Sequence, residues 1–251
     1  MVTYFLVRER LKNCQKIVIK IGSNALVNKD GFNHETIKDL AKEIALFTNA
    51  GKEIILVSSG AIALEKTVTK TTHLSKYFYA SIGQKYLIQE YDHCFEETNL
   101  LTSQILITKR ELKEKESIKK LKLSINHALE LGIITIINEN DAIAHNSFEN
   151  NDILAAEIAN ITNSDLLILL TNTNGIYSCI KSKKTISYAT KEKLSNYILR
   201  ENSDYGTGGM ETKLIASEIC KNTNTIIASA FEKDILTKIL NGKDTGTLIQ
   251  K

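Results

Sequence analysis

The chain has 251 residues, of which 43% are hydrophobic, enough for one large domain or for two lobes that share a sheet. Its formal net charge of +3 suits small acidic substrates and is too weak to indicate a nucleic-acid surface. No apolar run is long enough to span a membrane, and the four cysteines form no CxxC pair. We therefore expect a cytoplasmic protein without a disulfide framework or a zinc site.

Short apolar runs alternate with longer amphipathic patterns along the chain. Runs rich in Ile, Val and Leu predict strands at 16–22, 53–60, 103–108, 133–138, 165–171 and 224–230. Helical periodicity predicts helices at 34–51, 83–99, 117–132 and 151–163, and another from about Gly209. The first and third of these helices end at glycines, Gly51 and Gly132, as helices often do. Apolar strands separated by helices predict an α/β fold, with a parallel sheet covered on both faces.

The first strand, KIVIKIG, contains a lysine, Lys20, inside an otherwise apolar run. One interpretation is an edge strand whose lysine faces solvent. The other is a lysine that projects into a cleft, beside the small-residue turn GSN at 22–24, whose N–H groups could approach a phosphate.

The second strand ends in SSG, so that Ser58, Ser59 and Gly60 precede a helix. A serine in this position can be a simple N-cap. A helix N-terminus is also a good place to bind a carboxylate or a phosphate.

Two polar clusters follow further along the chain. INENDAIA places a run of amides and carboxylates, ending in Asp141, after a buried strand; it predicts either an Asx-rich turn or an amino-acid site in which Asp141 pairs with the ammonium group. FENNDILAAEIA places Asn150, Asn151 and Asp152 at a helix start, where Asp152 is either a cap or a site residue.

The last two motifs are also ambiguous when each is taken alone. LILLTNTNGIYS places Thr171 and Asn172 after the most apolar strand, as a hairpin turn or as part of a site. GTGGMETK at 206–213 lacks the spacing of a P-loop, and it predicts either a flexible turn or a phosphate-binding loop that ends in Lys213. Because ligands of parallel sheets bind beyond the carboxyl ends of the strands, we expect these turns to meet at one site.

The ordered set IVIKIGSNAL, ILVSSGAIAL, INENDAIA, NNDILAAEIA, LLTNTNGIYS and GTGGMETKLIAS resembles the amino acid kinase family. The resemblance covers the chain from about Lys16 to Ile249. It implies a single kinase domain over 1–251 with a three-layer αβα fold and a mainly parallel sheet, like that of carbamate kinase. Within that domain it implies an amino-acid-binding lobe at 1–160 and a nucleotide-binding lobe at 161–251.

The resemblance also implies roles for individual residues. Lys20 and Lys213 match the two lysines that stabilise the transferring phosphoryl group, and Asp152 matches the aspartate that orients them. The positions that match amino-acid-binding residues are Ser59, Asp141 and Asn151. The positions that match the nucleotide site are Lys20, Thr171, Asn172, Thr207, Gly208, Gly209, Met210, Glu211, Thr212 and Lys213.

Two motifs depart from the usual pattern of the family. The nucleotide motif usually reads TD, where this chain has Thr171-Asn172, and the loop that usually reads GDND is ENND here, so that Asn150 replaces an acidic residue. The chain ends soon after the kinase portion, as in members that lack a C-terminal PUA domain.

The activity that the resemblance implies is the phosphorylation of free L-glutamate on its side-chain carboxylate by ATP with Mg²⁺. The products are ADP and L-glutamyl 5-phosphate, and the reaction begins proline synthesis. The pair SSGAIA and INEND favours glutamate over the acceptors of acetylglutamate kinase, aspartokinase or uridylate kinase, and the absence of an evident general base also favours a carboxylate acceptor. A non-catalytic sensor is the alternative from another class, although both lysines and Asp152 are present. The family further implies a homodimer or homotetramer, and a labile product favours direct handover to the next enzyme.

Overall fold

An eight-stranded sheet forms the centre of the computed structural model, which describes residues 2–69, 73–145, 148, 150–178, 184–194 and 209–251. The strand order is β5-β6-β4-β1-β7-β9-β10-β8, and β10 runs antiparallel to β9 while the other pairs are parallel. The strands are β1 (Lys16–Ile21), β4 (Glu53–Val57), β5 (Thr102–Ile107), β6 (Ile134–Glu139), β7 (Leu166–Thr171), β8 (Tyr188–Thr190), β9 (Asn224–Ser229) and β10 (Thr247–Gln250). A small separate hairpin joins β2 (Val27–Asn28) to β3 (Gly31–Phe32). The mainly parallel sheet confirms the predicted fold class.

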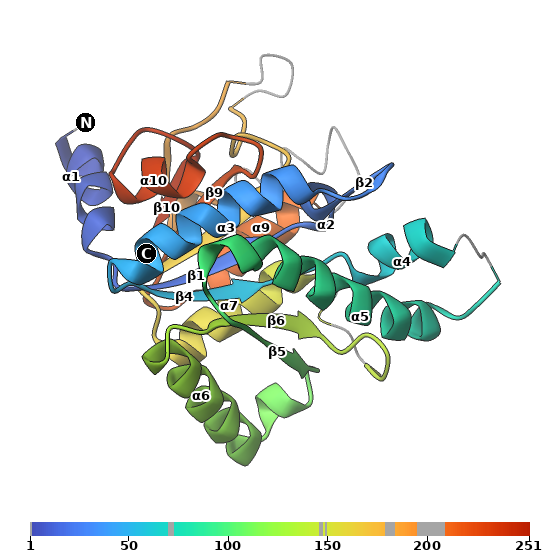
Figure 1. The fold of residues 1–251 in the computed structure, drawn as a ribbon. Coiled ribbons are helices and arrows are strands. Elements are labelled where there is room, and N and C mark those ends of the chain that lie inside the picture. Colours follow the sequence, from blue (N-terminus) through green and yellow to red (C-terminus); the bar gives the residue numbers. More distant parts are fainter. Residues whose placement is uncertain (1, 70–72, 146–147, 149, 179–183, 195–208) are drawn as a thin grey trace.

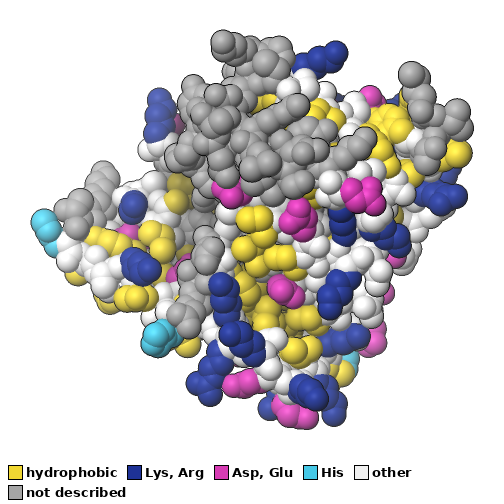
Figure 2. Space-filling view, turned by 180° about the vertical axis from the view of Figure 1, so that it is seen from behind, with side chains coloured by type: hydrophobic (Ala, Val, Ile, Leu, Met, Phe, Trp, Pro, Cys, Tyr) yellow, Lys and Arg dark blue, Asp and Glu magenta, His cyan; other side chains and the backbone are white. Residues whose placement is uncertain are grey.

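Helices cover both faces of this sheet (Figure 1). One face packs against α3 (His34–Asn49), α5 (Lys76–Phe95) and α10 (Ile235–Leu240), and the other against α6 (Lys115–Glu130), α7 (Asn151–Thr162) and α9 (Gly209–Ile219). The remaining helices are α1 (Val2–Arg10), α2 (Ser23–Leu26) and α4 (Ala61–Thr69). On the face opposite to that of Figure 1, basic and acidic side chains are interspersed (Figure 2).

Alternation along β1 decides which way Lys20 points. Ile17, Ile19 and Ile21 belong to the core under α3 and α5, whereas Val18 belongs to the core under α7 and α9. Since side chains alternate between the faces of a strand, Lys20 lies on the same face as Val18. β1 is hydrogen-bonded to β4 on one side and to β7 on the other, so the interpretation of Lys20 as an edge-strand residue is wrong.

The predicted strands and helices are present, with differences at some of their ends. The clearest difference is α5, which begins at Lys76, whereas the sequence predicted a start at Gly83. The cause is close packing, because a Cβ built on Gly83 would lie 1.9 Å from the carbonyl oxygen of Ala61 on α4. Gly83 is therefore a contact point between two helices and not a helix boundary. Gly51 and Gly132 do follow helix ends, and both have positive φ angles, +87° and +67°.

Residues 2–10 form the helix α1, which was not predicted from the sequence. Arg8 of α1 is only 1% exposed, and its guanidinium donates to the carbonyl oxygens of Ser187, Lys243, Thr245 and Gly246. This helix thus holds the turn that leads into β10. None of the helices within the described ranges is long and apolar enough to cross a membrane.

Candidate active site

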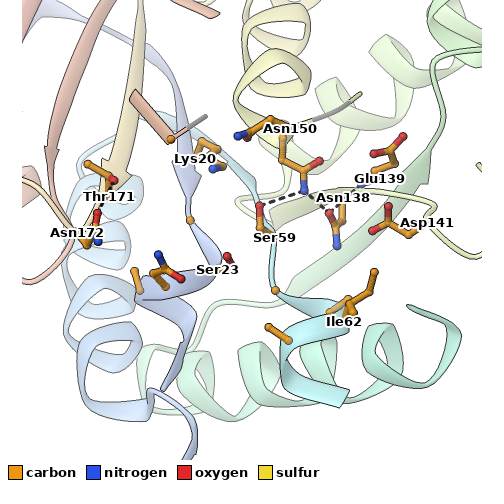
Figure 3. A pocket seen from close by; sticks show the side chains of 18 of the residues that line it. Lys20, Ser23, Ser59, Ile62, Asn138, Glu139, Asp141, Asn150, Thr171 and Asn172 are labelled. Atoms are coloured by element: carbon orange, nitrogen blue, oxygen red, sulfur yellow. Dashed lines mark hydrogen bonds between the residues drawn. The ribbon is translucent and has the colours of Figure 1, made fainter. Parts of the chain in front are cut away.

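A cavity of about 540 Å³ opens at the carboxyl edge of the sheet. Its walls come from the ends of β1, β4, β6 and β7 and from the first residues of α4, α7 and α9. Figure 3 shows Lys20, Thr171 and Asn172 on one side of this cavity and Asn138, Glu139 and Asp141 on the other. The polar turns after the strands therefore meet at one place, as the parallel sheet predicted.

Two lysines and one aspartate form a buried ionic group in one half of the cavity. Nζ of Lys20 lies 2.6 Å from Oδ1 of Asp152, and Nζ of Lys213 lies 3.1 Å from Oδ2 of the same carboxylate. The Asp152 side chain is 0% exposed, and the lysine side chains are 4% and 8% exposed. Lys213 also donates to the carbonyl oxygen of Gly209, at 2.8 Å. One carboxylate thus holds two ammonium groups that come from β1 and α9.

The N-terminus of α7 fixes the position of Asp152. The N-cap is Asn150, whose Oδ1 accepts from the backbone N–H of Asp152 at 2.9 Å. The interpretation of Asp152 as a cap is therefore wrong, and its carboxylate is left for the lysines. The Asn150 amide also donates to Thr212 Oγ1 at 2.9 Å, and that hydroxyl lies 3.2 Å from Oδ2 of Asp152. Asn150 therefore links the start of α7 to the first turn of α9.

Burial and the neighbouring charges shift the pKa values of Lys20 and Asp152. Burial lowers the pKa of the Lys20 ammonium group below its ordinary value, although Asp152 opposes the shift. Burial alone would raise the pKa of the Asp152 carboxyl, but Lys20 and Lys213 together outweigh it and hold this pKa below its ordinary value. Asp152 is accordingly ionised at neutral pH and is the counter-ion of both lysines.

Neutral side-chain amides form a hydrogen-bond network in the other half of the cavity. The side-chain amide of Asn151 donates to Ser58 O at 2.6 Å and to Asn138 Oδ1 at 2.7 Å, and it lies 3.2 Å from Ser59 Oγ. Asn138 in turn donates to Gln84 Oε1 at 3.1 Å. Figure 3 shows Ser59 and Asn138 joined through these bonds. Residues of β6, α5 and α7 and of the turn that follows β4 thus form one network.

Two carboxylates lie beside these amides. Asp141 and Glu139 both line the cavity, and Glu139 Oε1 accepts from the backbone N–H of Phe148 at 2.9 Å. Burial raises the pKa of Asp141, with Lys76 opposing the shift. Burial likewise raises the pKa of Glu139, against the hydrogen bond from Phe148. A cation bound near them would oppose both pKa shifts, because it would favour the ionised form.

The residues expected to bind a nucleotide are only partly placed at the cavity. Thr171, Asn172 and Gly209 line it, and Thr171 Oγ1 lies 3.3 Å from Asn172 Oδ1. Glu211 lies in the first turn of α9, and Met210 packs against the core beneath α7 and α9. Thr207 and Gly208 lie outside the described residues.

Several residues of the site had no individual role predicted from the sequence. Asn138 and Glu139 belong to the polar run of INEND, which as a whole predicted either a turn or an amino-acid site. Lys66 and Ile62 of α4 also line the cavity, but nothing in the amphipathic pattern of a helix distinguishes them. Gln84 was read as an ordinary helical residue, and only the folded structure reveals its contact with Asn138.

Comparisons with known proteins agree with this geometry. The model of the amino acid kinase family matches residues 15–229. Glutamate 5-kinase of Dehalococcoides mccartyi (strain CBDB1) is 36% identical over 256 residues, which cover 94% of this chain and 69% of that protein. Glutamate 5-kinase of Listeria innocua is 35% identical over 263 residues, which cover 96% of this chain and 95% of that protein.

Solved structures with low sequence identity share the fold. UMP kinase from Bacillus anthracis has a TM-score of 0.67 at 19% identity, over 94% of this chain and 96% of that one. Carbamate kinase from Giardia lamblia, bound to AMP-PNP, has a TM-score of 0.66 at 15% identity, over 96% and 99%. At these low identities the likeness shows the fold alone and says nothing of the substrate.

Proposed function

The chain belongs to the amino acid kinase family, and from this premise we propose that it is a glutamate 5-kinase. It transfers the γ-phosphoryl group of ATP to the side-chain carboxylate of L-glutamate, giving ADP and L-glutamyl 5-phosphate. This product would start proline synthesis. The proposal rests on the similarity to curated glutamate 5-kinases over almost the whole chain and on the lysine–aspartate–lysine group in the cavity.

The ionic group carries the chemical argument. In the reaction an oxygen of the glutamate carboxylate forms a bond to the γ-phosphorus, and the bond from that phosphorus to the bridging β–γ oxygen breaks. Negative charge is spread over the transferring group throughout. Lys20 and Lys213 would stabilise that charge, in a site where burial makes each contact stronger than it would be in water. Asp152 would hold the two ammonium groups close together before ATP arrives.

The reaction needs no general base. A glutamate side chain has an ordinary pKa of about 4.3, so the attacking carboxylate is already ionised at neutral pH. Asp152 could not serve as a base in any case, since its carboxylate is engaged by both lysines and its pKa lies below the ordinary value. An acceptor that has no proton to lose fits these residues better than a hydroxyl does.

The amide half of the cavity would bind the amino acid. We assign Ser59, Asn151 and Asp141 to this role, with the Asp141 carboxylate facing the ammonium group of glutamate. Burial raises the pKa of Asp141 and makes its ionised form less favourable than in water, so a substrate cation would bind there with a gain in electrostatic energy. The nucleotide would lie on the side of Thr171, Asn172 and the start of α9.

Magnesium would enter this cavity together with ATP. Within the part of the chain that the structure describes, no cluster of three or more His, Cys, Asp or Glu side chains could hold a metal ion. Asp152, which is fully buried and does not itself line the cavity, pairs with both lysines. Mg²⁺ commonly binds through substrate phosphates and keeps several waters, and it would here neutralise phosphate charge that the lysines do not reach.

The wider arrangement follows from the family. Residues 1–160 would form the amino-acid-binding lobe and 161–251 the nucleotide-binding lobe, with the cavity between the ends of their strands. We further infer a cytoplasmic homodimer or homotetramer, and direct handover of the labile acyl phosphate to the next enzyme.

The test is ADP release from ATP and Mg²⁺ with four acceptors side by side, L-glutamate, N-acetylglutamate, L-aspartate and UMP, in the presence of hydroxylamine. Hydroxylamine traps an acyl phosphate as a hydroxamate. Turnover with glutamate that yields a hydroxamate is the expected result. Turnover with another acceptor would replace the substrate and keep the roles of the lysines. Absence of turnover with all four acceptors, together with retained ligand binding, would favour a non-catalytic sensor.

A further inference from the structure

Two asparagines of α7 hold α9 at its two ends. Near the start of both helices, the side-chain amide of Asn150 donates to Oγ1 of Thr212 at 2.9 Å. Near their other ends, Asn160 donates to the carbonyl oxygen of Ile219 at 3.0 Å and accepts from the backbone N–H of Lys221 at 3.0 Å. Asn150 lines the cavity, whereas Asn160 is not among its described lining residues, so the first link belongs to the site and the second does not.

The backbone of α7 fixes the direction of the bond between Asn150 and Thr212. Oδ1 of Asn150 accepts from the N–H of Asp152 at 2.9 Å, and that N–H can only donate. The Asn150 amide therefore presents its NH₂ group to Thr212, and the Thr212 oxygen is the acceptor. The single proton of the Thr212 hydroxyl is left for Oδ2 of Asp152 or for the carbonyl oxygen of Gly209, each 3.2 Å away.

A carboxylate at position 150 would reverse this arrangement. It would accept the proton of Thr212, and it would place a second negative charge near Asp152 and its lysines. The amide of Asn150 instead joins the two helices without charge, and one carboxylate remains against two ammonium groups. The link therefore holds α9 in place without competing with Asp152 for the lysines.

The link matters because the neighbouring hydrogen bonds from the start of α9 to α7 end on one atom. Thr212 Oγ1 and Lys213 Nζ both contact Oδ2 of Asp152, at 3.2 Å and 3.1 Å. In the reaction Lys213 would have to reach the transferring phosphoryl group, whose oxygens compete with Asp152 for the ammonium group. The bond from Asn150 does not involve that carboxylate, so it can hold the first turn of α9 while Lys213 turns to the phosphate.

We propose that Asn150 is a positioning residue for phosphoryl transfer, which acts through Thr212 to hold the start of α9, and with it Lys213, in place. The proposal rests on the proposed kinase activity. Transfer depends on close placement of the reacting groups, and a displacement of about 1 Å can cost about 100-fold in rate. Asn150 needs no contact with the substrate for this role, so its effect belongs in kcat and not in the KM for glutamate.

The test uses Asn150→Ser, which keeps the cap of α7 and loses the link to α9. Serine caps a helix about as well as asparagine, so the N–H of Asp152 retains an acceptor, but the shorter side chain cannot reach Thr212. The matched control is Asn160→Ser, which makes the same substitution on the same helix and likewise loses the bonds to the other end of α9. Thermal melts show whether each variant folds.

For Asn150→Ser we expect kcat to fall by about tenfold, while the KM for glutamate stays within about threefold of the wild type. Asn160→Ser should leave both constants within about threefold. Thr212→Val removes the hydroxyl and leaves the cap of α7 untouched, and it should also lower kcat by about tenfold or more. In the Thr212→Val background, Asn150→Ser should lower kcat by no more than about twofold further, because both substitutions break the same bond.

An unchanged kcat in Asn150→Ser would overturn the proposal. A loss of the same size in the Thr212→Val background would overturn it too, since Asn150 would then act without Thr212. So would a raised KM for glutamate at unchanged kcat, which would make Asn150 a contact of the substrate. If Asn150→Ser does not fold, Thr212→Val carries the test, and an unchanged kcat there overturns the proposal. Failure of the proposed function is distinguishable, because it would show as a wild-type enzyme that forms no hydroxamate from glutamate.

Discussion

The two halves of the cavity are built from different interactions. On the side of Lys20 and Lys213, three charges are buried together and a single carboxylate balances two cations. On the side of Asn151 and Asn138, neutral amides share their hydrogen bonds among four elements of the fold. A buried ionic group of this kind fails when its single carboxylate is removed, because two uncompensated ammonium groups remain, whereas an amide network loses one modest bond at a time.

This difference matches what each half would have to do. Phosphoryl transfer needs strong positive potential that is in place before the reaction begins. Selection of an amino acid needs donors and acceptors in a fixed pattern, and large charges would obscure that pattern by attracting any ion. We therefore expect substitutions in the ionic half to act on stability and kcat, and those in the amide half to act on the KM for the amino acid.

The largest effect should come from Asp152→Asn. It leaves the ammonium groups of Lys20 and Lys213 buried without a counter-ion, which should lower the free energy of unfolding by about 3 kcal/mol or more. Urea denaturation at pH 7 measures this. Asp141→Asn is the control, because burial already disfavours its ionised form, so loss of that charge should not destabilise the fold. Equal destabilisation by the two substitutions would contradict the comparison between the halves.

Next in size is Lys213→Ala, which removes one of the two cations from the site of phosphoryl transfer. We expect kcat to fall by at least about 100-fold, the size of a single electrostatic contribution to a transition state. Steady-state kinetics at saturating ATP and glutamate measure the change. Lys16→Ala is the control, since Lys16 lies on β1 near its other end and pairs with Glu53 at 3.0 Å. Near wild-type turnover in Lys213→Ala would remove that residue from the mechanism.

A smaller effect is expected for Asp141→Ala in the amide half. Loss of the carboxylate that faces the ammonium group should raise the KM for glutamate by about tenfold, with kcat and the KM for ATP nearly unchanged. Kinetics with glutamate and ATP varied in turn separate the two constants. A change in the affinity for ATP alone would show that Asp141 belongs to the nucleotide side.

The smallest effect should be a displacement of the alkaline limb of the pH profile. Lys20 must be protonated to stabilise the phosphoryl group, and burial lowers its pKa, so kcat should fall as pH rises at values below the ordinary lysine pKa of about 10.4. Because Asp152 is the group that opposes this shift, Asp152→Asn should move the limb to still lower pH. Asp141→Ala should leave it in place. A limb that does not move in Asp152→Asn would mean that another group titrates.

Much of this site was predicted from the sequence alone. Six strands of the sheet and most of the helices were found because hydrophobic periodicity is a local property, which each segment displays by itself. The short strands β8 and β10 were not predicted. The ordered motifs placed Lys20, Asp152 and Lys213 in one site before any geometry was known. The start of α5 was missed, because the predicted helix began at Gly83, which in the structure lies inside α5 in close contact with α4.

Other features were decided only when distant segments came together. Whether Lys20 faced solvent or a cleft depended on which strands lie beside β1. The neighbours are β4 (residues 53–57) and β7 (residues 166–171), so β1 is not an edge strand. Whether Asp152 was a cap depended on Asn150 and on two lysines far away in the chain. The hydrogen bond between Gln84 of α5 and Asn138 of β6 joins residues 54 positions apart in the chain. A sequence displays its local periodicities and the order of its motifs, but partners in a parallel sheet are joined by long crossovers, and only the packed structure determines which side chains meet.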